Sequence, residues 1–247
     1  MQPVRVMLLG IALLWTLGWI PQSGTEILRR AEEKLKGKAS EGVLEMEIIK
    51  PDFRRTLKLR SWWVGNQKAL IEIIEPPREA GNKTLKVGSN LWMYLRNTET
   101  TIRIPPSMML QSWNGSDFTY DDLVRESNLP RDYEARLLGA DTLEGVPTWK
   151  LLLTPRPNAP VVWGKILYWV RQKDYLPAKV EYYDEHGRKV RTFLFQKIRS
   201  VGNRRIPTEW IVINNQKPGN RTIIRILQMH FDRPIPDRIF SLEELEG

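Results

Sequence analysis

The stretch SWNGSDFTYDDL, residues 112–123, gathers the side chains of this sequence that are best suited to chemistry. Asp117, Asp121 and Asp122 lie close together there, interleaved with aromatic residues. Carboxylates at this spacing could hold a cation, act as a general acid–base pair, or stabilise the first turn of a helix. Each of these kinds of chemistry needs different neighbours along the chain.

The neighbours of Asp117 do not fit a cation site. An EF-hand loop needs Asp or Asn at its third position, Gly at its sixth and Glu at its twelfth, and the residues after Asp117 supply none of these. The chain has no cysteine, and its two histidines, His186 and His230, are far apart. We therefore predict no metal site and no cofactor.

A helix start explains the same residues better. Thr119 and Asp122 fit the capping pattern S/T-x-x-D, with Asp121 and Asp122 in the first turn of a short helix YDDLVRES. Asn114-Gly115 supplies a turn before it, and Phe118 precedes the cap as an apolar staple. The sequence therefore predicts that Thr119 caps a helix and that the carboxylates serve mainly to begin it.

The N-terminus has the layout of an export signal. Arg5 precedes an apolar run over residues 6–20, and Pro21 with small or polar residues follows. A helix over this run would rise about 22 Å, short of a hydrocarbon core of about 30 Å. We predict a cleaved signal peptide over residues 1–24, which would otherwise anchor the protein in the membrane, and a periplasmic location.

Residues 25–247 are predicted to form one β-rich domain, because 41% of the chain is hydrophobic and no Gly/Ser-rich linker divides it. A capping box at Ser23 and Glu26 begins one amphipathic helix, which Gly37 ends. Runs of period two then predict strands over residues 43–49, 53–64, 68–75, 84–87, 91–95, 101–104, 133–138, 148–153, 165–171, 178–183, 189–199, 206–213 and 221–230. Short turns such as Gly65-Asn66 and Gly202-Asn203 predict an antiparallel meander.

Two of these strands, LWMYL over residues 91–95 and ILYWV over residues 166–170, are apolar on both faces. A sheet with one face in water alternates cleanly, so such strands are either covered on both sides or line an internal cavity.

Several segments together resemble the outer-membrane lipoprotein-sorting proteins of the LolA-like family. They are GNKTLKVGSNLWMYL, RIPPSMM and SWNGSDFTYDDL, followed by YWVRQKDYLPAKVEYYDEHGRKVRTFLFQKI, RRIPTEW and IFSLEEL. Arg96 stands where the family commonly has proline, and Asn82 where it has threonine. Neither departure touches the apolar pattern.

The resemblance implies a mostly β fold with a few helices. It would be a single antiparallel, strongly curved, unclosed β-barrel of about eleven strands, whose helices cover a concave apolar face. It also implies a non-enzymatic carrier that moves acyl chains of a lipoprotein or other lipid between membranes. An inner-membrane transporter or an outer-membrane acceptor would be its partner, and the stretch PPSMMLQSW, residues 105–113, with the short helix that follows would form part of a lid over the cavity.

Two other functions remain open. One is a lipid-responsive sensor that binds a partner membrane protein on the same fold. The other is a hydrolase, for which Asp117 and Asp121 would be the best candidates, since the chain has no cysteine and no G-x-S-x-G motif.

Apolar positions that alternate along the predicted strands give candidate cavity residues. Flexible methionines and broad aromatic rings suit alkyl chains of varying shape, although core packing would use the same residues. The candidates for the lipid cavity are Phe53, Leu57, Leu59, Trp63, Ile71, Ile73, Leu91 and Met93, and those for the lid are Met108, Met109, Trp113, Phe118 and Thr119.

Positive charge is concentrated late in the chain. Ten basic residues lie in residues 188–225 against the single acid Glu209, while the formal net charge of the whole chain is +9. A solvated face would explain such a run, and so would transient contact with an anionic membrane surface or an acidic partner. Nucleic acid is not expected to bind. The residues predicted for a basic docking surface are Arg199, Arg204, Arg205 and Arg221.

Overall fold

Helix α1 (Gly24–Lys36) opens the described part of the chain. The computed structural model describes residues 23–125 and 129–247, so residues 1–22 of the predicted signal peptide lie outside it. Ser23 caps the helix as predicted, accepting a hydrogen bond of 3.2 Å from the Glu26 amide, and Gly37 follows the last turn with a φ of 64°. Ile27 and Leu28 are fully buried, each contributing about 1.5–3 kcal/mol of apolar burial.

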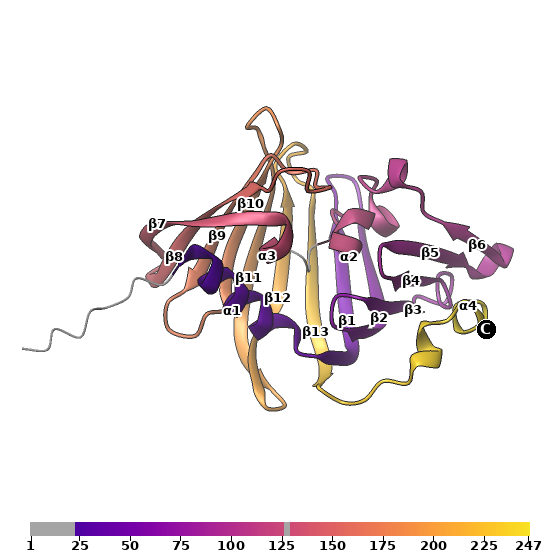
Figure 1. Ribbon diagram of the computed structural model, residues 1–247. Coiled ribbons are helices and arrows are strands. Elements are labelled where there is room, and N and C mark those ends of the chain that lie inside the picture. Colours follow the sequence, from indigo (N-terminus) through magenta and orange to yellow (C-terminus); the bar gives the residue numbers. More distant parts are fainter. Residues whose placement is uncertain (1–22, 126–128) are drawn as a thin grey trace, which may run out of the picture.

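The described residues contain thirteen strands, all joined in one antiparallel sheet (Figure 1). Every strand range predicted from the sequence overlaps one of them. The strands are β1 (Ala39–Ile49), β2 (Arg54–Val64), β3 (Lys68–Glu75), β4 (Lys83–Val87), β5 (Asn90–Leu95), β6 (Thr100–Arg103), β7 (Tyr133–Leu143), β8 (Val146–Pro155), β9 (Lys165–Arg171), β10 (Pro177–Tyr183), β11 (Lys189–Val201), β12 (Arg204–Asn214) and β13 (Arg221–Phe231).

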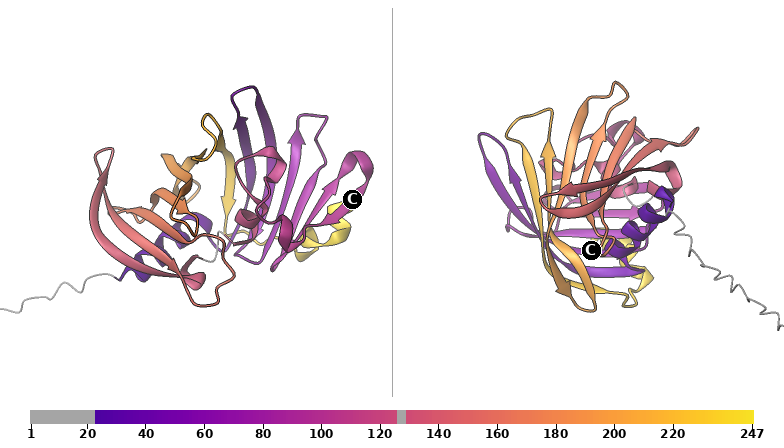
Figure 2. Two further views of the ribbon diagram at one scale, coloured as in Figure 1. Left: turned by 90° about the horizontal axis from the view of Figure 1, so that it is seen from above. Right: turned by 90° about the vertical axis from the view of Figure 1, so that its left-hand side faces the viewer.

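The strand order leaves the sheet open. It runs β6-β5-β4-β3-β2-β1-β13-β12-β11-β10-β9-β8-β7, so β6 and β7 are edges, and the last strand pairs with the first at the centre. Figure 2 shows the sheet curving strongly around one face without closing. The unclosed antiparallel barrel is therefore confirmed, with two strands more than the eleven that the family resemblance implied.

Short helices occupy both faces of the sheet. They are α2 (Tyr120–Arg125), α3 (Leu129–Asp132) and α4 (Leu242–Glu246), with the 3₁₀ turns η1 (Arg96–Thr98), η2 (Pro106–Met108), η3 (Trp113–Gly115) and η5 (Asp237–Phe240). Residues of α1, of the α2 region and of α3 belong to the main core on the concave face. Helix α4 and η5 instead pack against the outer face, where Phe240 and Leu245 meet Leu70 and Leu85. In the part of the chain that the structure describes, no helix has the length and apolarity to cross a membrane.

This arrangement explains the strands that are apolar on both faces. On β5, Leu91 and Met93 face the main core, while Trp92 and Tyr94 pack with the C-terminal segment on the outside. On β9, the outward Trp169 is covered by two cations, with Lys150 Nζ at 4.9 Å and Lys179 Nζ at 4.7 Å from its ring centroid. These two strands are therefore covered on both sides, which was one of the two explanations that their sequence allowed.

Candidate functional site

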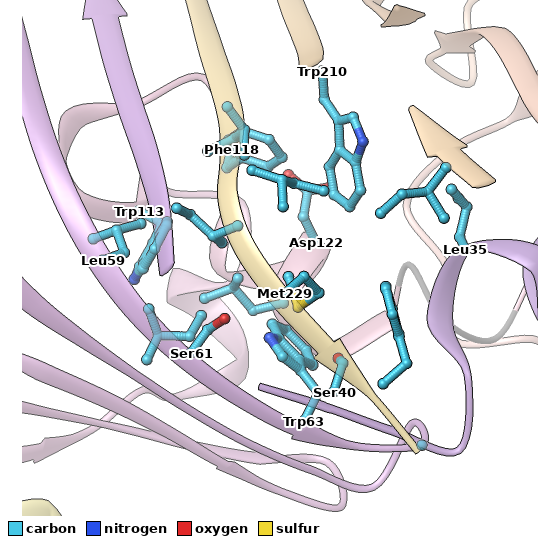
Figure 3. A pocket seen from close by; sticks show the side chains of 18 residues that line it. Leu35, Ser40, Leu59, Ser61, Trp63, Trp113, Phe118, Asp122, Trp210 and Met229 are labelled. Atoms are coloured by element: carbon cyan, nitrogen blue, oxygen red, sulfur yellow. The ribbon is translucent and has the colours of Figure 1, made fainter. Parts of the chain in front are cut away.

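An apolar cavity of about 170 Å³ lies on the concave face of the sheet (Figure 3). Its wall comes from β1, β2, β3, β12 and β13, with the end of α1 on one side and residues 113–123 on another. The lining residues are Leu35, Ser40, Leu44, Leu59, Ser61, Trp63, Gly65, Ile71, Trp113, Phe118, Asp122, Leu123, Ile206, Trp210, Ile224, Ile226, Met229 and Phe231.

Strand β2 supplies the wall through its alternation. Leu57, Leu59 and Ser61 are buried on one face, and Trp63 continues the same face. The prediction that the odd positions of this strand point inward is therefore confirmed for these residues. It is wrong for Phe53, which precedes β2 and is 48% exposed, because the strand begins only at Arg54.

The other predicted cavity residues divide into two groups. Leu59, Trp63 and Ile71 line the cavity itself. The remaining four belong to the surrounding core without reaching the cavity wall, three of them buried and Met93 partly buried; they are Leu57, Ile73, Leu91 and Met93.

The predicted lid residues also separate. Trp113 and Phe118 line the cavity, and Trp113 is fixed by a hydrogen bond of 3.1 Å from its Nε1 to Thr84 Oγ1. Met108 packs against the core, and Met109 is a buried member of that core which also borders a separate groove. Only part of the predicted lid therefore contacts the cavity.

Much of the cavity wall comes from residues that the sequence did not indicate. It comes from α1, β1, β12 and β13, and its members are Leu35, Leu44, Ile206, Trp210, Ile224, Ile226, Met229 and Phe231. The alternation on β13 could have indicated Ile224 and Ile226. A bulge then shifts the register, because Val43 pairs with Gln228 while Leu44 pairs with Ile226. The inward positions change from even to odd numbers at this bulge.

Thr119 and Asp122 form the predicted capping box. The Asp122 amide donates to Thr119 Oγ1 at 3.3 Å, and the Thr119 amide donates to Asp122 Oδ2 at 2.6 Å. Asn114 and Gly115 turn the chain with φ values of 50° and 74°. Phe118 packs edge-on against Phe193, with ring centroids 5.7 Å apart. The capping box and the turn before it are confirmed, whereas Phe118, predicted to be an apolar staple, packs on β11.

Asp122 has a second partner in Arg191 of β11. The guanidinium Nη1 lies 2.5 Å from Asp122 Oδ2, and Nη2 lies 2.7 Å from Oδ1. The same guanidinium lies over three aromatic rings, with centroids 4.6 Å away at Trp163, 5.1 Å at Tyr182 and 5.4 Å at Phe193. This buried pair attaches the start of α2 to the sheet.

Asp117 is attached to β13 and to the residue that follows β1. Its Oδ1 lies 2.7 Å from Lys50 Nζ, and its Oδ2 accepts a hydrogen bond of 2.9 Å from Thr222 Oγ1. Asp117 and Asp122 thus hold this segment against the sheet at two buried points, and the segment places Phe118 between them over the cavity. In the described residues no group of three or more acidic or histidine side chains is arranged to hold a metal ion.

The predicted basic docking surface is not one patch. Arg204 Nη2 lies 2.7 Å from Asp232 Oδ2, and its Nη1 donates to the Glu33 carbonyl, so this side chain ties β12 to the end of α1. Hydrogen bonds from the Lys38 amide and from Arg204 hold the pKa of Asp232 below its ordinary value.

Arg221 lies at the far end of the sheet. It pairs with Ile213 in the register, nine residues along β12 from Arg204, which corresponds to about 30 Å of strand. The grouping of Arg221 with Arg204 was wrong, because the antiparallel return of the chain puts residues close in sequence at opposite ends. Arg199 and Arg205 remain exposed beside the hairpin that joins β11 to β12.

Other basic residues of this segment are neutralised by Glu209 or by acids from elsewhere in the chain. Arg225 contacts Glu45, Glu47 and Glu209 at 2.7, 2.9 and 3.1 Å. Burial works to raise the pKa of Glu209, but hydrogen bonds from Lys197 and Arg225 hold it below its ordinary value. The local excess of positive charge in the sequence is therefore largely compensated in the fold.

A curved, unclosed antiparallel sheet with helices over its concave face is the LolA-like fold. A LolA superfamily protein from Nitrosomonas europaea superposes with a TM-score of 0.76 at 24% identity, over 90% of this chain and 99% of that one. A DUF1329 family protein from Desulfovibrio piger gives 0.82 at 21% identity, over 90% and 97%. A domain from Vibrio parahaemolyticus, assigned to outer membrane lipoprotein sorting, gives 0.80 at 21% identity, over 91% and 98%.

The family to which this chain belongs is shown by its sequence. The model of a family described as "Uncharacterized protein" matches residues 65–247, and the chain belongs to this family. No match was found among the curated proteins.

Proposed function

We propose that this protein is a non-enzymatic carrier that binds an acyl chain in its concave cavity and moves it between membranes. The observation that carries the proposal is the cavity itself, whose wall is apolar except at Ser40, Ser61 and Asp122 and the backbone at Gly65. A preformed cavity with such a wall favours an alkyl chain over a polar ligand. The likeness to LolA-like structures supports the same function.

The size of the cavity limits how much of a chain it can hold. A dry cavity of about 150 Å³ accepts a benzene molecule, so about 170 Å³ accepts roughly six carbons. Burying six methylenes supplies about 5 kcal/mol before ordering costs, which is too little for stable carriage. A longer acyl chain therefore requires the wall to open, and the Phe118 side chain, which no hydrogen bond restrains, is the part of the wall that we propose to move.

The proposed carrier works in the periplasm after export through the predicted signal peptide. Its donor would be an inner-membrane transporter and its acceptor an outer-membrane protein, with transient contact to an anionic membrane surface. The acyl chains would belong to a lipoprotein or another lipid.

Filling the cavity tests the proposal. Ile226 of β13 lines the cavity, whereas its neighbour Leu227 is 53% exposed on the opposite side of the strand. Ile226→Trp should displace an acyl chain, and Leu227→Trp is a matched control with the same new side chain on the same strand. We expect native mass spectrometry of detergent-free protein to detect bound lipid in the wild type and in Leu227→Trp, and much less in Ile226→Trp.

The proposal also requires exchange. Wild-type protein should pass a fluorescent fatty acid methyl ester to acceptor vesicles, and Ile226→Trp should not. Equal lipid occupancy in the two tryptophan variants would show that the lipid does not bind in this cavity.

A further inference from the structure

Ser61 is the polar residue of the cavity wall that the carrier function leaves unexplained. It lies on β2 between Leu59 and Trp63, and all three line the cavity. The side chain is fully buried, and its Oγ has no hydrogen-bond partner among the described residues. Figure 3 shows this oxygen pointing toward the cavity.

The strands around Ser61 give its hydroxyl no polar neighbour in the register. Its cross-strand partners are Gly42 on β1 and Ile71 on β3. A buried hydroxyl without a partner destabilises a fold, and alanine at this position would fit the same space without that cost. A hydroxyl kept in such a place is explained if a ligand supplies the missing partner.

Gly42 leaves room for a movable cover beside Ser61. A Cβ at Gly42 would clash with the Gln228 carbonyl oxygen and lie 2.8 Å from Met229 Sδ, so the glycine admits the backbone of β13 first and leaves the Met229 side chain lying against it. Met229 also lines the cavity. Because a methionine side chain is unbranched and flexible, it can swing aside and admit a ligand atom to Ser61.

The surroundings restrict the chemistry of that atom. A charged group would lose its hydration in an apolar wall, so a carboxylate or phosphate is disfavoured there. Asp122 also lines the cavity and adds negative charge against an anion, although Arg191 is its partner. A neutral carbonyl oxygen accepts a hydrogen bond from a hydroxyl at a much smaller desolvation cost.

From this geometry we infer that the cavity selects acyl chains in ester or amide linkage, whose carbonyl oxygen accepts a hydrogen bond from Ser61 Oγ. The inference rests on the proposed carrier function and names its ligand class. Free fatty acids, which are ionised at neutral pH, bind less well at this position.

Two volatile probes of equal chain length test the inference. Pentyl acetate carries an ester carbonyl, and octane carries no polar atom. Their uptake from vapour into protein solution can be measured by headspace gas chromatography for the wild type, Ser61→Ala, Ser61→Thr and Ser40→Ala. Ser40 is a control because it lines the same cavity but its oxygen is not among the buried atoms without a partner.

We expect Ser61→Ala to bind pentyl acetate about fivefold more weakly than the wild type, as the loss of one hydrogen bond implies. Octane uptake should be unchanged, which also shows that the cavity is intact. Ser61→Thr keeps a hydroxyl and should keep the preference for the ester, and Ser40→Ala should retain it as well.

The outcomes separate the two proposals. If the ratio of ester to octane uptake is the same in Ser61→Ala and the wild type, or if Ser40→Ala lowers it equally, the assignment of Ser61 is wrong while the carrier function stands. If neither probe enters the wild type, the carrier function itself fails. If Ser61→Ala loses octane uptake too, the test depends on Ser61→Thr. A Ser61→Thr variant that takes up octane normally but no longer prefers the ester would contradict the role of the hydroxyl.

Discussion

Arg191 of β11 and Asp122 at the start of α2 form a buried ion pair with two hydrogen bonds, although they are 69 residues apart in sequence. The exposed fractions of the two side chains are 4% and 6%. Asp122 also caps its own helix, so one carboxylate orients the segment that covers the cavity and attaches it to β11.

Removing one partner of this pair should be costly. Asp122→Ala leaves the Arg191 charge buried without its carboxylate and should lower the free energy of unfolding by about 3–5 kcal/mol. Replacing both residues, by Asp122→Ala with Arg191→Met, should recover part of the loss, because no uncompensated charge remains. Urea denaturation measures the three values. A double variant that is no more stable than Asp122→Ala would contradict this account of the ion pair.

The Thr119 cap links stability to ligand release. Thr119→Ala removes the acceptor for the Asp122 amide and should cost about 1 kcal/mol of stability. Because Phe118 is adjacent to the cap and lines the cavity, release of a fluorescent fatty acid methyl ester should become faster. Thr119→Ser retains the hydroxyl and is the matched control. Stopped flow measures the off-rate. An unchanged off-rate in Thr119→Ala would mean that the helix cap does not control ligand release.

Local patterns were sufficient for most of the fold. Alternation gave the strands, Gly-containing turns gave the reversals, and two capping boxes gave the starts of α1 and α2, because each depends on neighbours within a few residues. The face that a strand turns to the cavity was predictable on β2, where no bulge intervenes.

Features that depend on distant segments were not predictable. The outward side of β5 is covered by residues near the C-terminus, a partner that the sequence of β5 cannot indicate. Arg191 counted as one cation of a basic run, yet it is buried against Asp122. On β13 a single bulge shifts the residues that line the cavity from even to odd positions. Strict alternation along the strand therefore does not indicate Met229 and Phe231.

Acid should weaken the outer ion network around Glu209. Its pKa is lowered in the folded protein, so the carboxylate contributes stability above the ordinary glutamate value of about 4.5 and loses it as the pH falls below that value. Glu209→Gln should be less stable than the wild type at pH 7, and the difference should shrink toward pH 3. Urea midpoints across this range measure it. Glu134→Gln, on the exposed side of β7, controls for the substitution, and a difference that stays constant with pH would contradict the linkage.

The hairpin between β11 and β12 is the remaining candidate for contact with an anionic surface. Arg199 pairs with Ile206, so it shares a face with a cavity-lining residue, while Arg205 pairs with Ser200 and lies on the other face. Both side chains are exposed and form no ion pair with the described residues. Arg199→Glu with Arg205→Glu should therefore weaken binding to vesicles that contain anionic phospholipid, by about 1 kcal/mol for each cation lost.

Lys217 and Arg221 provide a matched control at the opposite end of the sheet. They are exposed, and Lys217→Glu with Arg221→Glu makes the same change in net charge. If the hairpin docks the protein, only the first double variant loses vesicle co-sedimentation at low salt, because the field of a charge falls off over about 8 Å at physiological ionic strength. Equal losses in both variants would mean that net charge alone attracts the protein to the surface. If both double variants still bind the vesicles, these basic residues form only a solvated face. Lipid occupancy of the cavity should be the same in both variants.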